Sequence, residues 1–123
     1  MTKDEVLDAL RAASKGLVYT SETDASLEAF AWKGADTLTD AKVRELAGVG
    51  SDVAVEHTTL DKFFHMVPSE DRKKFQKLTH ALQQQLTGIK VYKVGDEPEK
   101  QAYIVGKTKD GRWAGLKTTV VET

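Results

Sequence analysis

Three histidines are the side chains in this sequence best suited to acid–base chemistry or metal binding at neutral pH. They are His57, His65 and His80, and no two are four residues apart, so none forms a helical pair of zinc ligands. The absence of cysteine excludes a disulfide, a thiolate zinc site, an iron–sulfur cluster and a cysteine nucleophile. No GxSxG, GxGxxG or Walker motif occurs. The sequence does not exclude a serine nucleophile assisted by a histidine, but no motif supports one. The residue types favour a protein that is not an enzyme and needs no cofactor.

A run of four cations between residues 72 and 77 is the best candidate for contact with phosphate groups. The run follows Glu70 and Asp71 on a predicted helix, which favours a solvated helix face over a nucleic-acid site. The whole chain has 18 Lys and Arg against 19 Asp and Glu, a net charge of −1. Nucleic-acid binders usually carry a clear basic excess. We therefore expect no direct binding of nucleic acid.

The C-terminal residue Thr123 follows closely on residues 119–121, which have the pattern of a strand. A terminal carboxylate and a hydroxyl are hard oxygen ligands of the kind that Mg²⁺ and Ca²⁺ prefer. One residue does not make a metal site, but it can complete the coordination shell of a metal held by a partner protein. The simpler interpretation is an ordinary strand end.

These residues depend for their placement on nine predicted elements. The first helix lies between a capping box at Thr2 and a C-cap at Gly16, and Ser69 and Gly88 bound the longest helix. Residues 16–26 are expected to form a connection with turn chemistry at 21–24. Apolar spacing predicts further helices at 39–47 and 60–65, the longest helix at 70–87, and strands at 27–33, 52–57, 89–94, 101–107 and 113–121.

Composition and element order predict one domain over residues 1–123. With 40% hydrophobic and 30% charged residues the chain is typical of soluble globular proteins, and it shows no signal peptide or membrane span, so we expect a cytoplasmic protein. Strands mixed with helices indicate the α+β class. We predict a three-layer α/β/α sandwich with a mixed, largely antiparallel central sheet. The longest helix should bury Phe75, Leu78 and Leu82 against it.

Three aromatic residues in or near predicted strands have two possible roles. Tyr19, Trp32 and Trp113 are of the types that anchor protein interfaces. Packing in the core is the more frequent role for aromatic residues in strands.

Several short sequence motifs, in the same order along the chain, resemble the nuclease A inhibitor family. These proteins inhibit a sugar-non-specific DNA/RNA endonuclease. The similarity covers most of the chain and is loosest between residues 34 and 61. The motifs are Gly16-Leu17, Ser21-Glu22, Phe30–Gly34, Phe63-Phe64, Lys74–Leu78, Val91–Gly95, Tyr103–Thr108, Ala114-Gly115 and Val120–Thr123.

The resemblance implies an α/β/α sandwich that plugs the active site of a metal-dependent nuclease. It implies that the Thr123 carboxylate reaches the nuclease's catalytic metal and that Glu22 supports it through a metal-bound water. The chain itself would hold no metal. Glu22, Asp24 and Glu122 would supply a local acidic cluster for a basic active-site groove.

The family pattern also includes an Asp-Trp pair in a longer loop before the long helix. Residues 66–71 replace that loop here and contain no tryptophan, so Glu70 or Asp71 takes the place of the acid. The partner is expected to be a protein, with no membrane contact, and the chain is expected to be a monomer. The alternative is an interaction module of the same fold whose partner is not a nuclease.

Overall fold

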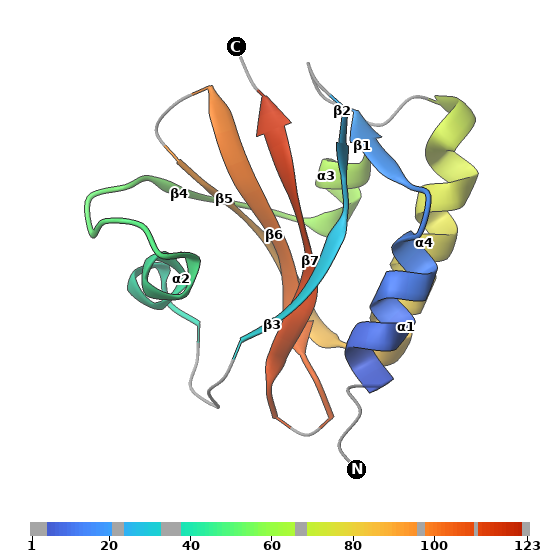
Figure 1. The fold of residues 1–123 in the computed structure, drawn as a ribbon, viewed down its shortest axis with the longest axis horizontal. Coiled ribbons are helices and arrows are strands. Elements are labelled where there is room, and N and C mark those ends of the chain that lie inside the picture. The colour runs from blue at the N-terminus through green and yellow to red at the C-terminus, as the bar shows by residue number, and fades with distance from the viewer. Residues whose placement is uncertain are drawn as a thin grey trace.

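The computed structural model describes residues 5–20, 24–32, 38–65, 69–95, 98–109 and 111–121. Within them the chain is an α+β protein with four α-helices, one short 3₁₀ turn, a five-stranded sheet and a separate two-stranded hairpin (Figure 1). In chain order the elements are α1 (Glu5–Ser14), β1 (Val18–Thr20), β2 (Asp24–Ser26), β3 (Glu28–Trp32), α2 (Asp40–Ala47), β4 (Val55–Thr58), α3 (Leu60–His65), η1 (Ser69–Asp71), α4 (Arg72–Gln85), β5 (Thr87–Val94), β6 (Glu99–Lys107) and β7 (Trp113–Val121).

The larger sheet has the strand order β3-β7-β6-β5-β4, and each neighbouring pair is antiparallel. The prediction of a mixed sheet is therefore wrong for the described strands. Short connections join β5 to β6 and β6 to β7, and a short connection permits only antiparallel pairing. The last third of the chain consequently forms the centre of the sheet.

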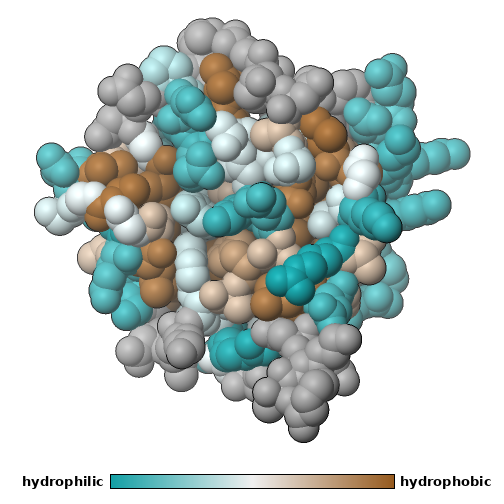
Figure 2. Space-filling view, in the orientation of Figure 1, coloured by the Kyte–Doolittle hydropathy of each residue, from teal (hydrophilic) through white to brown (hydrophobic). Residues whose placement is uncertain are grey.

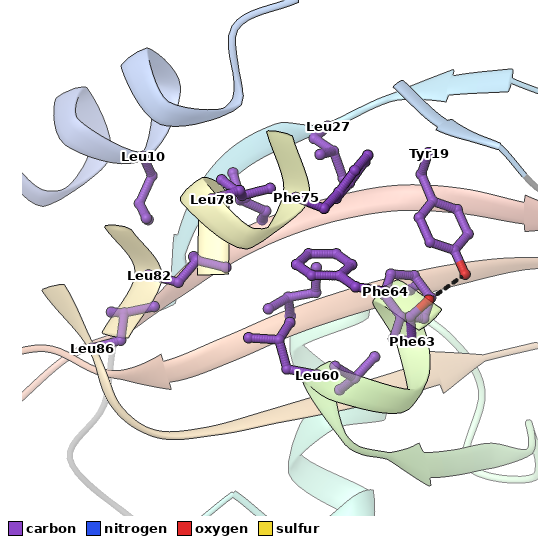
Figure 3. Packing of buried hydrophobic residues seen from close by; sticks show 14 of the residues in the cluster. Leu10, Tyr19, Leu27, Leu60, Phe63, Phe64, Phe75, Leu78, Leu82 and Leu86 are labelled. Atoms are coloured by element: carbon purple, nitrogen blue, oxygen red, sulfur yellow. Dashed lines mark hydrogen bonds between the residues drawn. The ribbon is translucent and has the colours of Figure 1, made fainter. Parts of the chain in front are cut away.

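One face of the sheet packs against α1, α3 and α4. Alternate residues of β5, β6 and β7 point to this face, among them the fully buried Val91, Ile104 and Leu116. Figure 3 shows Phe75, Leu78 and Leu82 of α4 among the side chains of this cluster. Their predicted burial is confirmed, because each is at most 2% exposed.

The outer face of α4 is polar. Lys73, Gln76, Lys77 and His80 are exposed, and hydrophilic side chains cluster over this helix in the space-filling view (Figure 2). This agrees with a solvated face for the cationic run.

The other face of the sheet carries a second, smaller cluster, which includes the fully buried Val43 of α2. The remaining buried members are Tyr92 and Val94 of β5 and Tyr103 and Val105 of β6. Figure 1 shows α2 on the opposite side of the sheet from α1 and α4. The two clusters use the two alternating sets of residues along the same strands.

Several predicted elements have different boundaries in the structure, and the differences are largest at residues 16–26, at β4 and at the longest helix. Residues 16–26 are not a simple connection but contain the hairpin of β1 and β2. Strand β4 begins at Val55 instead of residue 52, because the backbone at Val53 is held in a turn: its N–H donates to Gly50 and its carbonyl accepts from the Arg44 guanidinium.

The longest helix is also shorter than predicted. Residues 69–71 form the turn η1, and α4 ends at Gln85 because Leu86 is extended, with φ −130° and ψ 152°. Gly88 is therefore not a helix cap. It lies inside β5 with φ 61°, where the register with β6 shifts, so its freedom from a side chain serves a β-bulge. The predicted cap at Thr2 lies outside the described residues.

Candidate functional site

The hairpin of β1 and β2 pairs the two segments that flank residues 21–23, the first ending at Thr20 and the second beginning at Asp24. Its antiparallel register pairs Val18 with Ser26, Tyr19 with Ala25, and Thr20 with Asp24. The strands are only three residues long, and an isolated hairpin of this size has little stability of its own. Its position must therefore be set by contacts with the rest of the protein.

Tyr19 provides the main contact between the hairpin and the core. Its ring stacks on the ring of Phe63 in α3, with centroids 4.2 Å apart and an interplanar angle of 3°. Its hydroxyl donates a hydrogen bond of 2.9 Å to the backbone carbonyl of Phe63, drawn as a dashed line in Figure 3. Tyr19 is 2% exposed. Of its two possible roles, core packing is the one the structure shows.

Strand β7 contacts both strands of the hairpin. The hydroxyl of Thr118 donates a hydrogen bond of 3.4 Å to the carbonyl oxygen of Ala25 in β2. Figure 1 shows that β7 ends, at Val121, on the same end of the molecule as the ends of β1 and β2 at Thr20 and Asp24. One end of the fold therefore contains Thr20 and Asp24, which flank residues 21–23, and Val121, which precedes residue 122.

The structure describes three of the six predicted site residues. Asp24 is the first residue of β2, and its side chain is outside the described part. Glu70 is exposed and Asp71 is half-buried, both in η1, and α4 begins at the same end of the molecule (Figure 1). The other three, Glu22, Glu122 and Thr123, lie outside the described residues.

The described residues contain no group of three or more histidine or acidic side chains that could hold a metal ion. The one histidine with a carboxylate partner among them is His57, whose Nε2 lies 2.5 Å from Asp40 Oδ1 with both side chains about half exposed. Within the same residues no helix is long and apolar enough to cross a membrane.

Sequence reasoning missed Tyr19 and Thr118 as determinants of this end of the molecule. The run Val18–Thr20 is rich in strand-forming residues and is followed by turn residues, which is the usual signature of a hairpin. That signal was present in the sequence. The partners are distant in sequence: Phe63 is 44 residues from Tyr19, and Ala25 is 93 residues from Thr118. No local pattern indicates either contact.

The chain belongs to the family described as nuclease A inhibitor-like protein, whose profile matches residues 4–123. This match covers nearly the whole chain and confirms the resemblance found in the motifs. No individual curated protein matches the sequence. Membership of an inhibitor family indicates a nuclease as partner, and a function in binding rather than catalysis.

Replacing Tyr19 by phenylalanine should lower the free energy of unfolding by about 1–2 kcal/mol, because the Phe63 carbonyl loses its donor in a buried place. The stacked ring is retained, so the change isolates the hydrogen bond. Tyr103→Phe is the matched control: Tyr103 is 8% exposed, and its hydroxyl has no hydrogen-bond partner among the described residues. Urea denaturation measures both. An equal loss in the two variants would contradict a role for the Tyr19 hydroxyl.

Proposed function

We propose that this protein inhibits a metal-dependent, sugar-non-specific endonuclease by binding over the active site of the enzyme. The observation that carries the proposal is the family match over residues 4–123, which covers nearly the whole chain. In this proposal the chain is not an enzyme and holds no metal of its own.

The proposed contact with the nuclease uses the end of the molecule formed by the hairpin and β7. A nuclease holds phosphate oxygens on a divalent cation, and a carboxylate imitates such an oxygen. The C-terminal carboxylate of Thr123 would bind the metal directly, and Glu22 would act through a metal-bound water. The attachment of β2 to β7 through Thr118 and of β1 to α3 through Tyr19 supports this arrangement, because it fixes the described ends of these strands together.

Neighbouring acids would complete the contact. Asp24 and Glu122 are each within two residues of the proposed metal-directed groups in sequence, and Glu70 and Asp71 precede α4 at the same end of the fold. Basic grooves attract acidic surfaces, so these four residues are proposed to steer association more than to strengthen the final complex.

The same proposal includes the three-layer α/β/α arrangement. Two hydrophobic clusters on opposite sets of sheet residues, one with α1, α3 and α4 and one with α2, support it. A sheet covered on both faces would leave its ends as the natural place for a binding surface.

Cleavage of plasmid DNA and of RNA by a metal-dependent non-specific endonuclease tests the proposal. Adding the protein should abolish cleavage of both substrates near equimolar ratio. Glu22→Gln should weaken inhibition about tenfold, since it removes a charge that acts through water. Glu45→Gln is the matched control, because the Glu45 side chain is 71% exposed on α2 and faces none of the proposed contacts. Cleavage unaffected by the wild-type protein would overturn the proposal.

A further inference from the structure

A cavity of about 270 Å³ opens beside the second face of the sheet, where β5 and β7 begin and β6 ends. Leu38, which precedes α2, and Val105 of β6 form part of its wall. Because Trp113 also lines it and Val121 is at the other end of β7, the cavity lies at the end of the sheet away from the proposed nuclease contact. The volume is near the lower limit of small-molecule sites, which is about 300 Å³.

Three hydrogen-bond donors line this cavity without a partner among the described residues. The Tyr92 side chain is 2% exposed, and its hydroxyl makes no hydrogen bond within that part of the chain. Lys90 and Lys107 form no ion pair there either. Buried tyrosine hydroxyls nearly always have a partner. An acceptor supplied by a ligand would satisfy the Tyr92 hydroxyl, and a negative charge on it would attract the exposed Lys90 and the half-buried Lys107.

Burial and one nearby carboxylate keep the Tyr92 hydroxyl protonated, so that it can donate a hydrogen bond. Burial first, and the Asp40 carboxylate second, raise the pKa of Tyr92, so the proton stays on the oxygen at neutral pH. Asp40 is itself paired with His57, whose ring contacts the edge of the Tyr92 ring. The lysines are therefore the charged groups that line the cavity, and both are positive.

The rest of the lining suits a flat apolar group. Trp113 offers an aromatic wall, and the Nζ atom of Lys107 lies 5.8 Å from the centre of its ring. Leu38 and Val105 add aliphatic surface. Aromatic side chains bind planar rings by stacking, and the free energy gained by stacking a nucleobase depends little on which base it is.

We propose that this cavity binds a small phosphate ester that carries an aromatic ring, of the size of a nucleoside monophosphate. The phosphate accepts hydrogen bonds from Lys90, Lys107 and Tyr92, and the ring lies against Trp113. A phosphate monoester has nearly two negative charges at neutral pH, which matches two lysines better than a single carboxylate does. This site goes beyond the proposed inhibition of a nuclease and does not depend on it.

Isothermal titration calorimetry with adenosine 5′-monophosphate tests the site. The nucleotide should bind with one site per chain and at least about tenfold more tightly than inorganic phosphate or adenosine, because each of these lacks half of the contacts. No binding of the nucleotide at millimolar concentration would overturn the proposal. Equal binding of phosphate and nucleotide would overturn the role of the aromatic wall.

Matched variants locate the site. Lys90→Gln with Lys107→Gln should weaken nucleotide binding about a hundredfold, or tenfold for each lost charge-assisted contact. Lys73→Gln with Lys77→Gln makes the same change of charge on the outer face of α4 and should leave binding unchanged. Equal losses in the two double variants would overturn the assignment to the cavity. Nuclease inhibition should be unaffected by either pair, so failure of one proposal is distinguishable from failure of the other.

Tyr92→Phe separates the buried hydroxyl from the rest of the site. Nucleotide binding should weaken several-fold, while the melting temperature of the free protein should stay the same or rise, because the change removes a buried donor without a partner. A lower melting temperature with unchanged binding would show that the hydroxyl serves the fold and not a ligand.

Discussion

Replacing Gly115 by alanine should destabilise the fold by about 3 kcal/mol or more. Gly115 lies in β7 between Phe30 of β3 and Val105 of β6. A Cβ atom at this position would collide with the carbonyl oxygen of Ile104, and it would lie 2.7 Å from the carbonyl carbon of Ile104 and 3.0 Å from the Cα of Val105. All three atoms are backbone of a central strand, so no change of rotamer can relieve the contact.

Two other glycines provide a graded comparison for this prediction. A Cβ at Gly106 would lie 2.8 Å from the Leu86 Cβ and 2.9 Å from the Thr87 carbonyl oxygen, a smaller conflict. At Gly50 the nearest atom is a side-chain oxygen of Asp52 at 3.1 Å, which can move. The losses of stability should therefore decrease from Gly115 to Gly106 to Gly50. Thermal unfolding measures this, with a fall of roughly 10–15 °C expected for Gly115→Ala. A Gly115→Ala protein as stable as Gly50→Ala would contradict the backbone register of β6 and β7.

The elements predicted best from the sequence are those whose pattern is local. The strand at 113–121 has the predicted bounds, because five of its nine residues, Trp113, Thr118, Thr119, Val120 and Val121, are of types that favour strands. The apolar stripe of the longest helix was likewise found from spacing alone, since Phe75, Leu78 and Leu82 repeat at the period of a helix.

Two of the boundaries that were wrong depend on contacts distant in sequence. Gly88 follows a helical pattern and looks like a helix cap, but pairing with β6 draws residues 87 and 88 into β5. The hairpin of β1 and β2 is held by Phe63 and Thr118, and neither contact has a local signature. The order of strands in the sheet likewise depends on contacts that have no local signature in the sequence.

The type of site stays a prediction from the sequence, and the contacts that support it could not be predicted. The motifs that resemble the family include Ser21-Glu22 and Val120–Thr123, and these two contain residues proposed to face the nuclease. That Tyr19 and Thr118 hold the two flanking segments follows only from tertiary packing. The cavity beside Tyr92 is another product of packing, since its lining residues come from the segment before α2 and from three strands.

Two glycines added after Thr123 should reduce inhibition of the nuclease by roughly 10–150-fold. This range corresponds to one lost charge-assisted contact of about 1.5–3 kcal/mol. The extension moves the carboxylate away from its proposed place on the metal and adds backbone to the contact. The same two glycines added before Met1 are the matched control and should leave inhibition unchanged.

The melting temperature distinguishes this loss from damage to the fold. The last strand ends at Val121, so an extension after Thr123 adds residues beyond the sheet and should leave thermal unfolding unchanged. Loss of inhibition at an unchanged melting temperature is the expected result. The loss should exceed that caused by Glu22→Gln, because glutamine keeps the shape of the side chain and Glu22 is proposed to reach the metal only through a water. If the extended protein inhibits as strongly as the wild type, the terminal carboxylate does not bind the metal, and the nuclease must be blocked through another part of the surface.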